Sequence, residues 1–151
     1  MTQSPAPYSP TRPKDRDAAD GGSEAHPEDV IAFPDGLPGF ESCRRFVVIA
    51  YDDEQTFQCL QALDAPGPAF LTIDPARALK RYRLILSPAD RLRLDVQESD
   101  TLLWLAIVTV APDGTRTVNL RAPVVINPRL MVGLQVMPHQ SLYPIRHPLS
   151  L

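Results

Sequence analysis

The side chains that most often perform chemistry near neutral pH are scattered along this chain. The three histidines are His26, His139 and His147, and none has a Cys or His neighbour at an interval that suits a metal ion. Ser42 lacks the Gly-x-Ser-x-Gly setting of a serine nucleophile, and Cys59 lies within a strand-like run. We therefore expect no catalytic residue, no metal site and no cofactor, and we do not expect an enzyme.

The length and the charge of the chain further limit the class of protein to which it can belong. A chain of 151 residues suits one domain. Residues 1–29 carry three basic against six acidic side chains, so the formal charge of −3 arises there and the remainder is neutral. A neutral remainder without a Lys/Arg cluster argues against non-specific nucleic-acid binding, which needs several cations on one face.

Targeting signals are not evident in the sequence. No apolar run reaches the roughly 18 residues that span a bilayer, and the N-terminus has no apolar signal core. Two cysteines, Cys43 and Cys59, are too few for a disulfide framework. We expect a soluble, cytoplasmic, monomeric protein that does not bind membranes.

The composition changes at Val30. Residues 1–29 hold five prolines and almost no aliphatic bulk, so they cannot bury enough apolar area to offset the entropy of ordering. We predict a disordered, Pro-rich acidic leader over residues 1–29 and a folded domain over residues 30–151.

The folded part consists of short β-rich runs between turn signals, which predicts an all-β sandwich or small barrel. One short helix is expected after the N-cap candidate Ser87. The run at 102–110 lacks alternation, which fits a central strand covered on both faces. The expected strands are residues 45–51, 56–63, 69–73, 82–86, 102–110, 115–120, 124–126 and 130–137.

Residues 111–114 read APDG, the order expected of a tight turn that closes on a left-handed glycine. This predicts that residues 115–120 pair back on residues 103–110 as a hairpin.

Residues 33–41 read FPDGLPGFE and cannot form a helix or a central strand. They predict two tight turns back to back that fix the directions of Phe33, Leu37 and Phe40. Those apolar side chains either plug one end of the core or face a partner.

Polar residues in the second half of the chain also have two interpretations, one structural and one functional. Asn119 and Asn127 each precede or approach a proline, where asparagine caps turns or contributes to a recognition surface. The segment at 141–148, SLYPIRHP, is either a recognition surface or a C-terminal strap that packs on the barrel.

Four ordered blocks resemble the FliW family of bacterial flagellar assembly factors. They are FPDGLPGFE at 33–41, LAIVTV at 105–110, NLRAPVVIN at 119–127 and YPIRHPL at 143–149. The resemblance implies an all-β, mainly antiparallel fold: a small, partly open single-domain β-barrel with one or two short helices and no enzymatic activity.

The resemblance also implies partners. Family members bind the translational repressor CsrA and relieve its block on flagellin translation. They also bind flagellin, near its C-terminal helix, in competition with CsrA. Direct binding of nucleic acid is not implied.

One departure concerns the first strand. Family members usually begin with a strand before the FPDG segment, whereas this chain has its Pro-rich leader there. Either the strand is missing and a sheet edge is open, or the leader supplies a poor substitute, or the start site is incorrect.

Two sets of residues are candidates for function. The acidic turn formed by Asp52, Asp53 and Glu54 would repel RNA beside a basic RNA-binding protein, or is simply a solvated turn. The candidate partner-binding residues are Leu37, Phe40, Glu41, Asn119, Asn127, Tyr143 and Arg146.

Two other functions compete with this reading. A single-stranded RNA-binding barrel needs aromatic platforms flanked by cations, for which Tyr82 between Arg81 and Arg83 is the local candidate. A small-ligand-binding barrel would contain a large apolar cavity.

Overall fold

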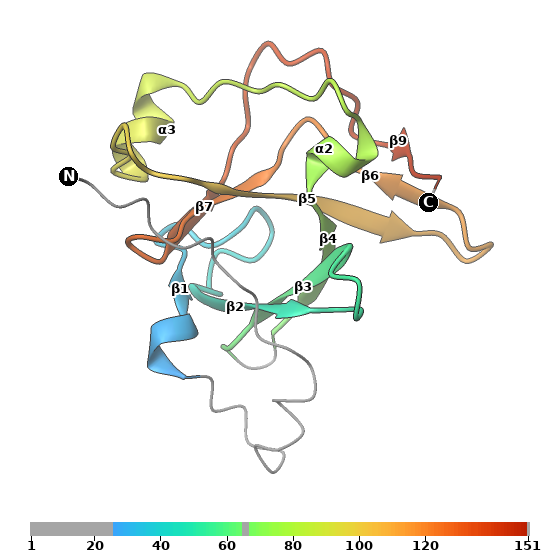
Figure 1. Cartoon of the computed structure of the whole chain (residues 1–151). Coiled ribbons are helices and arrows are strands. Elements are labelled where there is room, and N and C mark those ends of the chain that lie inside the picture. The colour runs from blue at the N-terminus through green and yellow to red at the C-terminus, as the bar shows by residue number, and fades with distance from the viewer. Residues whose placement is uncertain (1–25, 65–66, 151) are drawn as a thin grey trace.

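The computed structural model describes residues 26–64 and 67–150, and β-strands dominate them (Figure 1). The helical elements are the 3-10 turn η1 (Pro27–Asp29), α2 (Pro75–Ala78) and α3 (Pro88–Arg93). The strands are β1 (Ile31–Ala32), β2 (Arg45–Ala50), β3 (Phe57–Ala62), β4 (Ala69–Ile73), β5 (Leu103–Val110), β6 (Arg116–Val118), β7 (Val124–Asn127), β8 (Val132–Gln135) and β9 (His147–Pro148).

The strands form a ring. They pair in the order β4-β3-β2-β1-β8-β7-β5, and a further pairing of β4 with β5 joins the two ends. Neighbours are antiparallel except β1 and β8. Strands β6 and β9 extend from β5 as a flap outside the ring. The fold is thus the all-β, partly open barrel that the resemblance implies.

The ring is weakest at β1, where the family's first strand was in question. Ile31 and Ala32 pair with β2, but only Ala32 pairs with β8, opposite Val132. The residues directly before the FPDG segment therefore supply a two-residue strand. Because one residue pair is a short ladder, the barrel is only partly closed at this seam.

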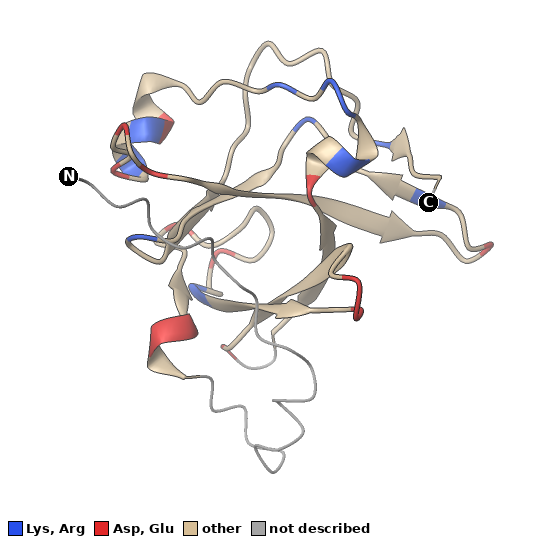
Figure 2. Cartoon of the chain, viewed as in Figure 1, with Lys and Arg blue, Asp and Glu red and all other residues tan. Residues whose placement is uncertain are grey.

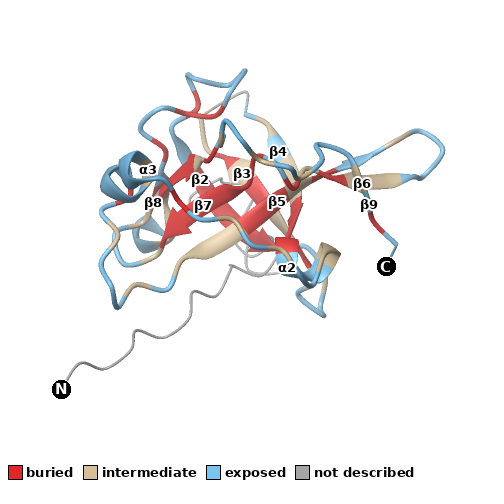
Figure 3. Cartoon of the chain, turned by 90° about the horizontal axis from the view of Figure 1, so that it is seen from above, coloured by how far each residue is buried: buried red, intermediate tan, exposed pale blue. Residues whose placement is uncertain are grey.

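The strands of the ring carry most of the buried residues (Figure 3), and the buried side chains of the described residues are apolar apart from Thr72 and Asn127. Phe33 and Phe46 meet edge to face with ring centroids 4.8 Å apart, and both are fully buried. Their cluster also holds Ile31, Leu60, Leu105 and Ile126. This packed cluster, built from described residues, is the arrangement that favours a protein-binding module over a small-ligand barrel.

Most expected strands are confirmed. Residues 69–73 form β4 with the expected bounds, and residues 103–110 and 116–118 form the expected hairpin, with Gly114 at φ +89°. Ser87 caps α3 by accepting the Asp90 N–H. The short helix α2, capped by Asp74, was not foreseen.

Two expectations are wrong in part. Residues 82–86 form no strand, because this extended segment crosses the end of the ring with no β-ladder partner among the described residues. The side chains of this segment still alternate in exposure, since Leu86 is buried and Ile85 is 91% exposed. Strand β5 is not covered along its whole length, because Thr109 and Val110 project beyond the core and are exposed.

The leader lies largely outside this description. Residues 1–25 are not among the described residues, and residues 27–29 form η1. No helix in the described part of the chain is long and apolar enough to cross a membrane.

Charge is distributed unevenly over the fold. Residues 26–74 carry nine acidic and two basic side chains, whereas residues 75–89 and 114–150 carry eight Lys or Arg and no carboxylate side chain. Figure 2 shows red on η1 and on the β2–β3 turn, and blue along the α2–α3 connection and in the loops above β5. The neutral domain expected from the sequence is therefore strongly polarised.

Candidate partner-binding surface

The loop at residues 33–41 forms the two turns that its sequence predicts. The Gly36 N–H donates to the Phe33 carbonyl at 2.9 Å, and the Phe40 N–H donates to the Leu37 carbonyl at 2.7 Å. Both turns need a left-handed glycine, Gly36 at φ +64° and Gly39 at φ +85°. The two turns fix the direction of each apolar side chain in the loop.

The loop uses its apolar side chains in both of the expected ways. Phe33 and Leu37 point inward and are 0% and 2% exposed, so they plug the core. Phe40 is 39% exposed and meets Phe70 edge to face, with ring centroids 5.5 Å apart. Glu41 is exposed, and its carboxylate accepts the Gly39 N–H at 2.9 Å. Phe40 and Glu41 therefore remain at the surface.

The C-terminal strap is both packed and exposed. The Tyr143 ring lies against Tyr82 with centroids 4.6 Å apart, and the Tyr143 hydroxyl accepts the Arg83 N–H at 2.7 Å. Leu142 and Ile145 are 98% and 53% exposed. Arg146 is also exposed. Tyr143 thus fastens the strap to the barrel while its neighbours face solvent.

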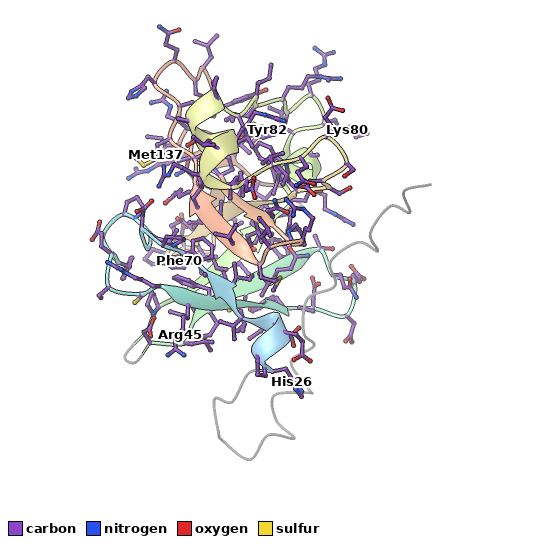
Figure 4. The ribbon with its side chains drawn as sticks, turned by 90° about the vertical axis from the view of Figure 1, so that its left-hand side faces the viewer. His26, Arg45, Phe70, Lys80, Tyr82 and Met137 are labelled. Atoms are coloured by element: carbon purple, nitrogen blue, oxygen red, sulfur yellow. The ribbon has the colours of Figure 1, made fainter. Side chains whose placement is uncertain are left out.

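A surface cleft of about 560 Å³ lies where these segments meet. We call it the four-block cleft, because each of the four sequence blocks contributes to its lining. The contributions are Leu37 and Pro38 from the first block, Ile107 from the second, Asn119, Arg121 and Ala122 from the third and Ile145 from the fourth. Phe70, Gln135, Met137, Pro138 and His139 complete it. In Figure 4, Met137 lies above Phe70 on the same side of the molecule.

The polar groups in the four-block cleft are largely satisfied within the chain. The Asn119 side-chain oxygen accepts the N–H groups of Arg121 and Ala122, both at 3.1 Å. The Gln135 amide donates to the Ala122 carbonyl at 2.9 Å. The remaining lining is mainly aliphatic and aromatic, so the cleft is suited to apolar side chains of a partner.

A second cleft of about 800 Å³ shares Pro38, Gln135 and residues 137–139 with the first. It extends past Asp35 and Glu41 to α3, where Asp90 and Arg93 line it. Arg93 pairs with both Asp35 and Asp90, whereas the Glu41 carboxylate accepts the Gly39 N–H. The two clefts together form one continuous recessed surface.

Asn127 does not join this surface. It is fully buried, and its amide donates to the Leu94 carbonyl at 2.9 Å and to Asp100 at 3.2 Å, while its oxygen accepts the Arg129 N–H. The prediction that Asn127 binds a partner is therefore wrong for this conformation. The residue instead fixes the turn after β7, as its alternative reading states.

Asp100 and Arg129 complete that buried connection. Their side chains pair at 2.7 Å, and only 2% of the Asp100 side chain is exposed. The hydrogen bond from Arg129, followed by that from the Gln97 N–H, lowers the pKa of Asp100 to about 2. The pair joins the segment after α3 to the β7–β8 turn.

The acidic turn stands apart from the clefts. The Asp52 carboxylate accepts the Thr56 N–H at 2.9 Å and so caps the β2–β3 turn, whereas Asp53 and Glu54 are exposed. None of the three lines the clefts just described. Asp52 therefore has a structural role, and only its two neighbours present free carboxylates.

Tyr82 is not the open aromatic platform considered for single-stranded RNA. One ring face packs against Tyr143, and its hydroxyl donates to the Leu120 carbonyl at 2.9 Å. Burial and the nearby Tyr143 hydroxyl raise the pKa of Tyr82. This geometry removes the main sequence argument for base stacking.

The remaining candidates for chemistry stay separate in space. Among the described residues, no group of three His, Cys, Asp or Glu could hold a metal ion. Cys43 is buried and Cys59 is half-buried. His139 lines both clefts, although the sequence did not single it out for that place.

Comparison with known proteins decides the family. The family profile described as FliW protein matches residues 15–149. The chain belongs to the FliW family. A flagellar assembly factor FliW of Natranaerobius thermophilus is 34% identical, covering 85% of this chain and 87% of the relative. That of Syntrophotalea carbinolica is 36% identical over 85% and 92%, and that of Bacillus subtilis is 31% identical over 82% and 87%.

The fold agrees with a solved FliW structure. A crystal structure described as that of the flagellar assembly factor FliW superposes with a TM-score of 0.78 at 30% identity. It covers 85% of this chain and 90% of the solved chain. The partly open barrel is therefore the FliW fold.

Proposed function

We propose that this FliW-family protein is a flagellar assembly factor that exchanges two protein partners. It binds a CsrA-type translational repressor and relieves the block on flagellin translation. It also binds flagellin, and flagellin bound to it prevents capture of the repressor. The observation that carries the proposal is the convergence of all four family blocks on one cleft.

The chemistry of the four-block cleft supports a protein partner. Pro38, Ile107 and Ile145 offer apolar contacts from three segments that are distant in the sequence. The turns at residues 33–41 and the Tyr82–Tyr143 contact hold these segments in place, so binding costs little ordering entropy. Phe40 and Arg146 lie exposed on two of the same segments.

The acidic half of the molecule supports a basic partner. Residues 26–74 carry nine acidic side chains, including Asp53 and Glu54 on the β2–β3 turn. A basic RNA-binding protein would be attracted to this half, and the same charges would repel RNA phosphates. In this proposal the protein works as a monomer in the cytoplasm, where flagellin is translated.

The experiment is calorimetric titration of the full chain with the CsrA-type repressor of the same organism, repeated with flagellin already bound. We expect saturable binding of the repressor that weakens when flagellin is present. Phe40→Ala should weaken binding of at least one partner, whereas Tyr51→Ala, which removes an exposed aromatic outside the clefts, should not. Failure of the folded protein to bind either partner would overturn the proposal.

A further inference from the structure

The Tyr82–Tyr143 contact gathers three segments that all carry exposed cations. Tyr82 lies between Arg81 and Arg83, and its hydroxyl donates to Leu120, the residue before Arg121. Tyr143 accepts the Arg83 N–H through its hydroxyl and the Arg121 guanidinium through its carbonyl. Arg146 follows on the same strap. We call Lys80, Arg81, Arg83, Arg121 and Arg146 the cationic face.

The cations of this face are not neutralised inside the described chain. The ion pairs in residues 26–64 and 67–150 are made by Arg45, Arg93 and Arg129. Residues 75–89 and 114–150 contain no Asp or Glu that could pair with the face locally. Figure 2 shows separate blue segments along this part of the molecule, and Figure 4 places Lys80 beside Tyr82 in its upper part. The positive charge is therefore available to a partner.

An apolar cleft borders the cationic face. It has a volume of about 470 Å³ and is separate from the four-block cleft. Tyr82, Leu84 and Trp104 line it together with Pro75. Arg83 and Asp74 stand at its wall, and the Asp74 carboxylate is engaged there by the Ala76 N–H at the start of α2. Ile85, which is 91% exposed, also contributes. A half-buried tryptophan in a cleft edged by arginine is typical of the anchor positions of protein interfaces.

We propose that this cleft and the cationic face bind an acidic, amphipathic segment of a protein partner. Apolar side chains of the segment occupy the 470 Å³ cleft beside Trp104, and its carboxylates pair with Arg81 and Arg83. The site uses a different cleft from the partner exchange proposed above, and Arg121 is the member of the cationic face that also lines the four-block cleft. It gives the molecule a second binding surface of opposite charge to the acidic β2–β3 turn.

The observations favour an acidic peptide over RNA. Single-stranded RNA is bound by stacking its bases on open aromatic rings beside a positively charged groove. Here Tyr82 and Tyr143 cover one another, with centroids 4.6 Å apart. The exposed apolar side chain of Ile85 offers a peptide contact and no stacking plane.

The test is selection of random phage-displayed peptides on the immobilised full chain, followed by fluorescence anisotropy of the enriched peptides. We expect enriched peptides with net negative charge and regularly spaced apolar residues, and binding that weakens with salt. Arg81→Glu/Arg83→Glu should weaken binding by about tenfold or more. Arg44→Glu/Arg91→Glu, the charge-matched control outside the face, should leave the affinity unchanged.

Three outcomes would overturn the proposal. One is enrichment of peptides without acidic excess, or of none. Another is equal loss of affinity in both double variants, which would indicate an effect of net charge alone. The third is tight binding of single-stranded oligouridylate that Arg81→Glu/Arg83→Glu abolishes, with no acidic peptide enriched. Circular dichroism melts establish whether the variants are folded. If Arg81→Glu/Arg83→Glu does not fold, Arg81→Gln/Arg83→Gln is used in its place.

Discussion

Tyr82 and Tyr143 lie ring against ring with their centroids 4.6 Å apart, one on the α2–α3 connection and the other on the C-terminal strap. This contact fastens the strap over the β6–β7 loop, because the Tyr82 hydroxyl and the Pro144 carbonyl bind opposite sides of the Leu120 backbone. It therefore positions Ile145 at the four-block cleft and Arg146 at the cationic face. Predictions about binding depend on this fastening.

Tyr82→Phe should destabilise the fold by about 1 kcal/mol, because the buried Leu120 carbonyl loses its side-chain donor. Tyr143→Phe should cost less, since the Arg83 N–H that it releases is in an exposed residue and can bind water. Urea unfolding of both variants measures the difference. A larger loss for Tyr143→Phe would contradict this account of the strap.

Leu37→Ala and Phe40→Ala should separate stability from binding. Leu37 is 2% exposed within the main core, so its truncation should cost about 2–5 kcal/mol. Phe40 is 39% exposed and contacts Phe70 at the surface, so its truncation should leave the melting temperature nearly unchanged while weakening partner binding. Thermal melts and calorimetry test both. A collapse in the stability of Phe40→Ala would show that it belongs to the core.

Gly36→Ala should be more damaging than Gly39→Ala. Both glycines have positive φ, which costs an alanine about 1–2 kcal/mol. A Cβ on Gly36 would in addition lie 2.7 Å from the backbone of Phe40 and Glu41, whereas a Cβ on Gly39 would meet open space. Chemical unfolding of the two variants should give a clearly larger loss for Gly36→Ala, and equal losses would refute the predicted clash.

Asp100→Asn should make the free energy of unfolding less dependent on pH in the acidic range. The folded-state pKa of Asp100 is lowered from 3.8 to about 2, so its ionised form stabilises the fold above pH 3.8 and this contribution is lost as the pH falls toward 2. At neutral pH the wild-type protein should unfold at a higher urea concentration than the variant. This difference in urea midpoint should narrow as the pH falls from 3.8 to about 2. A gap that is constant with pH would exclude the Arg129 pairing as its cause.

Asp53→Lys/Glu54→Lys should reduce the ability of the protein to displace RNA from the repressor, if the acidic turn repels phosphate. Asp52 is left intact because it caps the turn through Thr56. Asp95→Lys/Glu98→Lys changes two exposed carboxylates outside the acidic half and serves as the charge-matched control. A gel-shift competition at two salt concentrations measures displacement. Full displacement by the turn variant would refute the role of this turn.

Local features were predictable from the sequence because neighbouring residues determine them. Proline and glycine restrict the backbone wherever they occur, so the turns at residues 33–41 and the hairpin at Gly114 follow from the residues themselves. The mainly apolar run of β4 and the Ser87 cap of α3 are equally local. Family membership was likewise carried by four short blocks, since each keeps its residues in order.

Tertiary structure decided everything that depends on distant segments meeting. The sequence could not distinguish the inward Leu37 from the outward Phe40, because burial depends on which strands close around the loop. It placed Asn127 on a partner surface, whereas packing against Leu94 and Asp100 buries it. The four-block cleft and the separation of charge also arise only when the ring of strands brings residues far apart in the chain to one face, since spatial proximity is set by β-pairing and not by sequence order.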